Sequence, residues 1–361
     1  MFRKAFILSK KCCLSGNYNL KKRRVGLKEA SYYEKKEAKT VQCRLCPRNC
    51  VIKPGQRGDC RVRKNQEGVL YSMVYGKPSA INADPIEKKP QFHFLPGTLA
   101  YSIGTAGCNL HCDFCQNWEM SQSAPEDISS YEMSPAKVVE EALRNKCSSI
   151  AYTYNDPVVF FEYAIDTAKL AKKKGLKNIF VMNGFISPEP LKEACRHMDG
   201  FHVDLKGFRD KFYREVCHAW LAPVLESLKI LQKEKAWFEM INLLIPGYND
   251  SSQEVTEMCA WIVENLGTGY PLHFSRFFPF YKMHDADITP MSTLSKSAEI
   301  ARKAGLDYVY VGNVMGEEAN TMCPGCGDLL IRRSSFFEVL ENRLKQGKCP
   351  GCGQKIQGVW R

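Results

Sequence analysis

Short apolar runs alternate with longer amphipathic segments over residues 98–313 of the chain. The apolar runs predict seven buried strands, at residues 99–104, 149–154, 178–183, 201–205, 239–245, 272–278 and 308–312. The segments between them predict helices at residues 135–146, 157–174, 188–198, 211–234, 252–266 and 294–304. Repeated β-α units, about six in number, indicate an α/β fold in which a parallel sheet forms a partial or full barrel. The functional site of such a fold lies at the carboxyl ends of its strands.

Residues that begin and end helices stand where this pattern needs them. Ser134 and Asp156 are each followed by proline, which predicts a helix N-cap and a first helical residue at both places. Gly175 and Gly305 follow basic helix ends and predict C-terminal stops.

Cysteine-rich segments flank the predicted barrel on both sides. Residues 41–97 are expected to form a loop-rich cap with a hairpin, in which a strand at 69–75 leads into a turn at 76–78. The sequence Cys-Pro-Gly-Cys-Gly occurs at 323–327 and again at 349–353. The expected domains are therefore a basic, flexible tail (1–40), a four-cysteine metal-binding cap (41–97), a core barrel (98–315) and a zinc ribbon (316–361).

Composition places the chain among globular proteins of a reducing compartment. It has 361 residues, of which 44% are hydrophobic. Eleven of its 17 cysteines fall into three clusters, at 43–60, 108–115 and 323–352. Clusters of this kind indicate metal sites rather than a secreted disulfide framework, so we expect a cytoplasmic protein. No run approaches the ~20 apolar residues of a membrane span, and we expect no membrane partner.

The net charge of +12 is concentrated in the first 40 residues, which hold twelve Lys or Arg against three acidic residues. A solvated tail explains this bias, and a basic arm that touches nucleic acid or a membrane surface, or an organellar targeting peptide, is an alternative. The C-terminal cysteine segment is not notably basic, which argues against a nucleic-acid partner.

Cys108, Cys112 and Cys115 follow the first predicted strand of the barrel with C-x3-C-x2-C spacing. Three thiolates on one short loop can bind three irons of a 4Fe–4S cluster and leave the fourth iron open to a small molecule. A structural zinc site or scattered core cysteines are the alternatives, but zinc knuckles are built from paired C-x2-C units and four ligands.

Polar residues follow the other predicted strands, so we expect them at the same carboxyl end of the barrel as the cysteine loop. Singly, each has an ordinary structural explanation, such as a helix entry or an ion pair. Together around one cluster they favour a functional site. They are Asn155, Asp156, Asn183, Asp204, Lys206, Asn242 and Arg276.

The two remaining cysteine clusters predict further metal sites. Cys323, Cys326, Cys349 and Cys352 form two C-x2-C knuckles that indicate a closed zinc ribbon, with a redox-active dithiol as the alternative. A second set of four thiolates can bind either zinc or a second cluster, and we favour zinc because no electron route is required. This set comprises Cys43, Cys46, Cys50 and Cys60. Of the scattered cysteines, Cys217 is the one we would test for reactivity.

The cysteine triad resembles that of the radical S-adenosylmethionine (radical SAM) enzymes. The resemblance implies that SAM chelates the open iron and is cleaved by an electron from the cluster to methionine and a 5′-deoxyadenosyl radical, which abstracts hydrogen from a substrate. It also implies an electron donor of the reductase or flavodoxin/ferredoxin type. Phe114 would cover the adenine, and the polar strand-end residues would bind the remainder of SAM.

Residues 28–361 resemble the radical SAM component of the AmmeMemoRadiSam system, which is related to pyruvate-formate-lyase-activating enzymes. The stretches that carry this resemblance are Cys-Arg-Leu-Cys-Pro-Arg-Asn-Cys (43–50), Asp-Pro-Ile-Glu-Lys-Lys-Pro (84–90), Gln-Asn-Trp-Glu (116–119), Val-Asp-Leu-Lys-Gly-Phe (203–208) and Gly-Val-Trp (358–360). The chain departs from relatives at Phe278 and Phe280, where His and Asp are usual, and at Tyr-Asn-Asp-Pro (154–157), where Gly-Gly-Glu-Pro is usual.

Two narrower or different functions stay open at this point. The resemblance implies either a glycyl-radical-enzyme activase or an enzyme that modifies a protein partner of the AmmeMemo system. A third possibility belongs to a different class of function: a non-enzymatic zinc-ribbon protein that binds nucleic acid.

Overall fold

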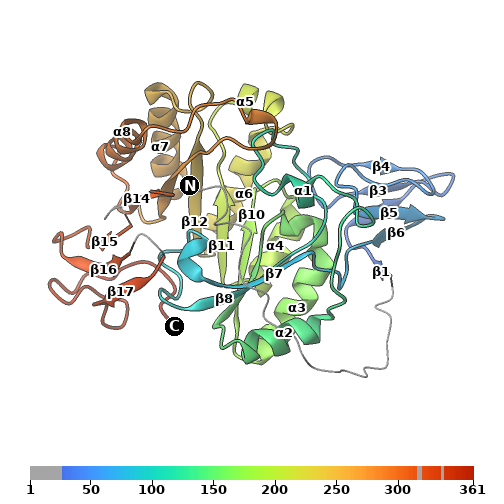
Figure 1. Cartoon of the computed structure of the whole chain (residues 1–361), viewed down its shortest axis with the longest axis horizontal. Coiled ribbons are helices and arrows are strands. Elements are labelled where there is room, and N and C mark those ends of the chain that lie inside the picture. The colour runs from blue at the N-terminus through green and yellow to red at the C-terminus, as the bar shows by residue number, and fades with distance from the viewer. Residues whose placement is uncertain (1–26, 315–318, 335–336) are drawn as a thin grey trace.

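The computed structural model describes residues 27–314, 319–334 and 337–361. They form one eight-stranded sheet and three smaller sheets of three strands each (Figure 1). The large sheet has the strand order β14-β13-β12-β11-β10-β9-β8-β7. Its strands are β7 (Ala80–Pro85), β8 (Leu99–Gly104), β9 (Ser149–Tyr152), β10 (Lys177–Met182), β11 (Gly200–Asp204), β12 (Phe238–Leu244), β13 (Leu272–Arg276) and β14 (Val309–Gly312).

The parallel sheet predicted from the sequence is confirmed. Strands β8 to β14 are parallel to their neighbours, and they correspond to the seven predicted strands. Strand β7 was not predicted; it pairs antiparallel with β8 and belongs to the segment assigned to the cap. In the described part of the chain β7 and β14 are the two edges, so the strand order is linear.

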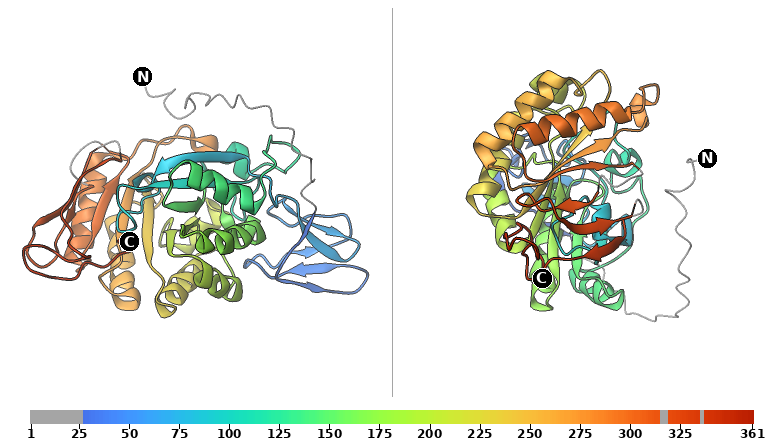
Figure 2. Two further views of the ribbon diagram at one scale, coloured as in Figure 1. Left: turned by 90° about the horizontal axis from the view of Figure 1, so that it is seen from below. Right: turned by 90° about the vertical axis from the view of Figure 1, so that its left-hand side faces the viewer.

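Each step between successive parallel strands passes through a helix, and the helices gather on one side of the sheet (Figure 2). The longer helices are α2 (Pro135–Arg144), α3 (Phe161–Lys173), α4 (Pro188–His197), α6 (Ala222–Lys233), α7 (Ser252–Leu266) and α8 (Met291–Lys303). The short ones are α1 (Trp118–Ser121), α5 (Asp210–Glu215), η1 (Ile86–Lys88), η2 (Pro157–Phe160) and η3 (Tyr281–Met283).

Two predicted helices are interrupted. The helix expected at 211–234 is divided into α5 and α6, because Pro223 lacks the amide that a continuous helix needs and instead stands in the first turn of α6. The helix expected at 157–174 begins as the 3-10 turn η2 before α3.

The predicted helix ends are otherwise confirmed. Ser134 Oγ accepts a hydrogen bond from Lys137 N at 3.3 Å, and a carboxylate oxygen of Asp156 accepts from Val158 N at 2.9 Å. Gly175 and Gly305 adopt φ angles of +78° and +98°, which glycine tolerates at the end of a helix.

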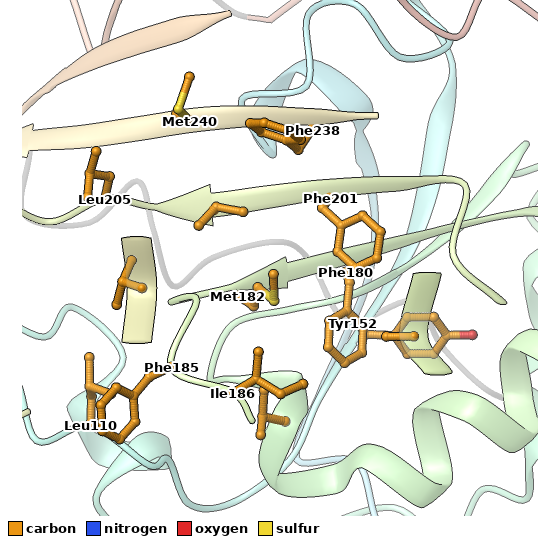
Figure 3. Packing of buried hydrophobic residues seen from close by; sticks show 14 of the residues in the cluster. Leu110, Tyr152, Phe180, Met182, Phe185, Ile186, Phe201, Leu205, Phe238 and Met240 are labelled. Atoms are coloured by element: carbon orange, nitrogen blue, oxygen red, sulfur yellow. The ribbon is translucent and has the colours of Figure 1, made fainter. Parts of the chain in front are cut away.

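A row of aromatic side chains crosses the sheet and anchors its core (Figure 3). Tyr152, Phe180, Phe201 and Phe238 occupy paired positions on the adjacent strands β9 to β12. All four side chains are buried, and the ring centroids of Phe180 and Phe201 lie 6.2 Å apart. Burying a phenylalanine stabilises a fold by roughly 1.5–3 kcal/mol, so this row stabilises the register of the strands that carry the site.

The cysteine-rich cap contains two small sheets, and it begins before the predicted boundary at residue 41. Their strands are β1 (Lys28–Glu29), β5 (Arg63–Gln66) and β6 (Val69–Ser72), and β2 (Tyr33–Lys35), β3 (Val41–Cys43) and β4 (Val51–Ile52). Residues 28–35 therefore belong to the cap and not to the predicted tail. The first 26 residues of that predicted tail lie outside the described part of the chain.

The hairpin predicted in the cap was wrong in its turn. Strand β6 ends at Ser72 and pairs with β5 through a turn at Glu67 and Gly68. Both turn residues have positive φ angles, +52° and +92°, as a tight two-residue hairpin requires.

The C-terminal segment forms a sheet of β15 (Thr321–Met322), β16 (Leu329–Arg333) and β17 (Val339–Asn342). It packs on Tyr308 and Tyr310 near the edge of the large sheet. The cap and this segment lie at opposite ends of the large sheet (Figure 1).

Candidate metal centre and cofactor site

The loop that carries Cys108, Cys112 and Cys115 begins directly after β8, at the carboxyl edge of the parallel sheet. It lies against the cap. Gly107 has a φ of +83°, and a Cβ at this position would stand 2.4 Å from the carbonyl oxygen of Cys60. Only glycine fits there, so the backbones of the loop and the cap are in direct contact.

The three thiols of the loop are shielded to different degrees. Cys112 is buried, while Cys108 and Cys115 are partly exposed. Leu110 N donates to Cys108 Sγ over 3.5 Å, and Ser121 Oγ lies 3.2 Å from Cys115 Sγ. Hydrogen bonds to sulfur are one of the means by which a protein tunes an iron–sulfur cluster.

The three thiols of the loop have raised pKa values. A hydrogen bond with Cys217, together with burial, raises the pKa of Cys112 well above its usual value. Burial raises the pKa of Cys108 and of Cys115. Iron binds thiolates, so loading of this site would release protons. Cys217, which the sequence singled out for a reactivity test, is a neighbour of Cys112.

Two side-chain amides that the sequence assigns to the cofactor brace the cysteine loop. Asn155 Nδ2 donates to the carbonyl oxygen of Gly107 at 2.7 Å, and its Oδ1 accepts from Thr105 N at 3.1 Å. Asn183 Nδ2 donates to Asn109 Oδ1 at 2.9 Å. Residues after β9 and β10 thereby hold the cysteine loop in place. These contacts support a positioning role for Asn155 and Asn183.

Asp156 links the same two strand ends from a buried position. One carboxylate oxygen caps η2, and the other accepts from Asn183 N at 2.7 Å. Burial raises the pKa of Asp156 to about 7, although the two backbone hydrogen bonds oppose this shift. Both of its oxygens accept hydrogen bonds from backbone amides. These contacts support a structural role for this carboxylate, which holds the ends of two strands together.

Charged side chains of β11 and the residues after it face the loop. Lys206 Nζ lies 2.9 Å from a carboxylate oxygen of Asp204, and His202 Nε2 lies 2.8 Å from the other. Burial acts to raise the pKa of Asp204, but Lys206 and His202 outweigh it and hold this pKa well below its usual value. Lys206 also lies 5.7 Å from the ring centroid of Phe114, which belongs to the cysteine loop. A carboxylate, an ammonium group and an aromatic ring thus meet beside the three thiols.

The last two predicted contacts are on β12 and β13. Asn242 is buried, and its Nδ2 donates to Leu205 O at 2.8 Å. Its Oδ1 has no hydrogen-bond partner among the described residues, which leaves one buried acceptor free. Arg276 Nε donates to Thr289 O at 2.8 Å, and its guanidinium lies 5.7 Å from the ring centroid of Phe278.

Two residues of the site were missed in the sequence. Arg48 reaches from the cap and donates to the carbonyl oxygens of Asn109, at 2.8 Å, and His218, at 2.5 Å. Asn109 is buried in the loop and donates to Phe185 O at 2.7 Å. The position of Asn109 directly after Cys108 could have marked it as a site residue. Nothing in the sequence around Arg48 indicates that it bonds Asn109, 61 residues away.

The C-terminal cysteines converge as predicted. The Sγ atoms of Cys323 and Cys352 are 3.6 Å apart, and so are those of Cys326 and Cys349. In the described part of the chain these four are the one set of three or more His, Cys, Asp or Glu side chains whose ligand atoms all lie within 4.8 Å of one another. A metal ion with four thiolates at 2.3 Å needs sulfur–sulfur distances of about 3.8 Å, so the donors fit a single tetrahedral ion.

The N-terminal cysteines also come together, but around a space. Cys43, Cys46, Cys50 and Cys60 all line one cavity of about 20 Å³ between the cap, the cysteine loop and η2. Burial raises the pKa of Cys46, Cys50 and Cys60, and for Cys60 the value is about 12.

The sequence profile of the Radical SAM superfamily matches residues 102–259, from β8 through the cysteine loop to α7. These residues form a radical SAM domain. Members of this superfamily are enzymes that use a 4Fe–4S cluster and SAM, and the three thiols of the loop are donors of the kind such a cluster requires. The specific reaction of this radical SAM chain does not follow from the match.

A curated relative extends the match over nearly the whole radical SAM chain. "Uncharacterized protein MJ0808" of Methanocaldococcus jannaschii is 44% identical over 335 residues, which are 92% of this chain and 100% of the relative. The chain belongs to the same family as this protein. The family therefore includes the cap and the C-terminal sheet as well as the core.

Solved structures resemble the core at low identity. A domain of a pyruvate-formate lyase-activating enzyme from Bacteroides vulgatus covers 46% of this chain and 99% of its own, with 15% identity and a TM-score of 0.41. A radical SAM methyltransferase from Sphaerobacter thermophilus covers 60% of this chain and 67% of its own, with 14% identity and a TM-score of 0.47. Similarities of this size carry no inference about the reaction. Among the described helices, none is long and apolar enough to cross a lipid bilayer.

Proposed function

We propose that this chain binds a 4Fe–4S cluster through Cys108, Cys112 and Cys115 and uses SAM to generate a 5′-deoxyadenosyl radical for hydrogen abstraction. The observation that carries the proposal is the convergence of these thiols with the Asp204–Lys206 pair at the carboxyl edge of the parallel sheet. When bound, the cluster supplies the electron that cleaves SAM.

The residues around the thiols have separate tasks in this proposal. Lys206 and Asp204 offer opposite charges to the carboxylate and amine of SAM, and Phe114 offers an aromatic face to its adenine. Asn242 offers its free Oδ1 to a hydroxyl or amine of the cofactor, and Arg276 offers a cation near the opposite side of the mouth. Seven parallel strands that curve as a partial barrel would enclose these groups and exclude water from the radical.

The production of 5′-deoxyadenosine from SAM tests the proposal. Anaerobically reconstituted protein with dithionite and SAM should yield this product, and Cys112→Ala should abolish the yield. Cys195→Ala, in α4, is the matched control and should retain it. An unchanged yield in Cys112→Ala would show that the loop is not the reactive site.

We further propose that the chain is the radical SAM component of an AmmeMemoRadiSam system and acts on a protein partner of that system, with electrons from a flavodoxin, a ferredoxin or a reductase. The resemblance of the motif at 84–90 supports this placement. Its Asp84 pairs with Lys89 at 2.8 Å and accepts from Tyr154 OH at 2.8 Å. Genes for the partner proteins beside this gene would support the assignment. The activase alternative predicts instead a glycyl radical in a candidate partner, detectable by electron paramagnetic resonance (EPR).

We also propose that the C-terminal cysteines bind one zinc ion. The 3.6 Å sulfur–sulfur distances support a single ion rather than a larger cluster. Purified protein should hold one zinc that is lost in Cys326→Ala/Cys352→Ala and retained in Cys112→Ala. Retention of zinc in the double variant would contradict the assignment.

A further inference from the structure

We propose that Cys43, Cys46, Cys50 and Cys60 hold a second 4Fe–4S cluster, separate from the one in the Cys108 loop. The sequence favoured zinc at this place. The arrangement of the thiols, the cavity between them and one buried cation favour the larger cofactor.

The spacing of the thiols is the first argument. The ribbon cysteines bring their sulfurs within 4.8 Å of one another, as a single ion requires. Among the described residues neither the N-terminal set nor the Cys108 loop contains three ligand atoms that meet this limit. A cluster takes each thiolate on a different iron and so separates its cysteines more widely than one ion does. The N-terminal set thus resembles the loop rather than the ribbon.

The cavity is the second argument. Its volume is about 20 Å³, and apolar side chains such as Leu45, Ile52, Val158 and Val159 complete its wall. The four thiols, two arginines and Asn109 make up most of the remaining wall, so possible metal ligands and cations face the same space. Cys326 and Cys352 of the ribbon are instead exposed to solvent. The N-terminal thiols therefore surround an internal cavity, whereas the sulfur atoms of the ribbon lie close together near the surface.

A buried arginine points to an anion in the cavity. Arg63 is 1% exposed and lines the cavity, and its Nη1 lies 3.9 Å from Cys43 Sγ. Its Nη2 is paired with Glu162, but its Nε is buried without a partner in the described part of the chain. A cluster with four thiolates is negatively charged, so a guanidinium 3.9 Å from one of its thiols would stabilise it.

The second site adjoins the first. Asn109, the residue after Cys108, forms part of the cavity wall, and Arg48 connects it to the cap through a 2.8 Å hydrogen bond. The carbonyl of Cys60 touches Gly107 on the other side. The proposed cluster would thus lie one layer of side chains from the loop.

Metal content and EPR spectra of three full-length proteins test the proposal after anaerobic reconstitution. Wild type should hold about eight irons and eight sulfides. Cys108→Ala/Cys112→Ala/Cys115→Ala should keep about four of each, with a reduced signal that SAM does not change. Cys46→Ala/Cys50→Ala should also keep about four, with a signal that SAM does change. Cys147→Ala/Cys259→Ala is the control for loss of buried thiols and should match wild type.

The opposite results are equally distinct. Wild type with about four irons and two zincs, one of them lost in Cys46→Ala/Cys50→Ala, would overturn the second cluster and leave the proposed function standing. A Cys108 triple variant with the same iron content as wild type would overturn the proposed function instead. The zinc of the ribbon reports whether each variant is folded, and Mössbauer counting of the wild type decides the number of clusters even where a variant does not fold.

Discussion

Asn155 Nδ2 donates a hydrogen bond to the carbonyl oxygen of Gly107 over 2.7 Å, which ties the end of β9 to the cysteine loop after β8. Its Oδ1 accepts a second bond from Thr105 N, so one side chain holds the loop at two points. The loop has little regular structure of its own, and its thiols depend on such contacts for their positions.

We expect Asn155→Ala to lower both the occupancy of the cluster and the yield of 5′-deoxyadenosine, by about thirtyfold. The reason is the loss of two hydrogen bonds worth about 1 kcal/mol each, which leaves the loop free to sample other conformations. Iron content and product yield measure the effect. Asn265→Ala removes one amide contact within α7 and is the control that should leave both unchanged.

Arg48→Ala should loosen the cap from the loop. The guanidinium donates to two backbone carbonyls and its side chain is 15% exposed, so we expect a loss of about 2 kcal/mol in the free energy of unfolding. Denaturant unfolding and protease sensitivity of residues 27–97 measure this loss. Arg44→Ala breaks an exposed pair with Glu34 and should have a much smaller effect on the free energy of unfolding. Equal effects of the two substitutions would contradict the bridging role.

Lys206→Met should weaken SAM binding at least tenfold. It removes the cation that pairs with Asp204 beside the loop and leaves Asp204 with His202 as its partner, so the pKa of Asp204 should rise toward its usual value. Anaerobic calorimetry with SAM measures the affinity. Lys192→Met breaks an exposed pair on α4 and should have no effect. Recovery of most of the affinity in Lys206→Arg would indicate that the charge matters rather than the shape.

His93 should make stability depend on pH. Its Nδ1 donates to Gln357 O at 2.7 Å, and its Nε2 lies 2.6 Å from Tyr310 OH, which can donate to the neutral ring. Burial lowers the pKa of His93 to about 4, whereas the unfolded chain has the usual value of about 6.5. The unfolded state therefore binds the proton first, and stability present above pH 6.5 is lost as the pH falls toward 4.

The expected loss is about 3 kcal/mol, from roughly 1.4 kcal/mol for each unit of pKa difference. Unfolding curves between pH 8 and 4.5 should show it for wild type and much less of it for His93→Gln. His284→Gln, at an exposed position, should follow wild type. A wild-type curve parallel to that of His93→Gln would contradict the assignment of the neutral ring.

The sequence predicted the frame of the molecule because its signals are local. Apolar runs and N-caps such as Ser134 each lie within a few residues of the element they specify, and the structure confirms them. Strand β7 was missed because it is an edge strand with exposed residues, and its pairing with β8 is long in sequence.

The site was predictable in its residues and less so in their contacts. Cys108, Cys112 and Cys115 can be identified from their spacing. Asp204 and Lys206 can be identified from their place at the end of a buried strand. The partners of Asn155 and Asn183 are backbone atoms and an amide of a loop about 50 and 74 residues away, which no periodicity encodes. The same holds for Arg63, whose partner Glu162 is on α3.

The contact between Gly107 and the carbonyl of Cys60 joins, through their backbones, the two segments that we propose to bind metal. A binding linkage is reciprocal, so metal in the cap must change the affinity of the loop for iron by the same factor by which iron in the loop changes the affinity of the cap. The order in which the two sites are filled during maturation can therefore alter the rate of assembly, but the total free energy of the loaded protein is independent of that order.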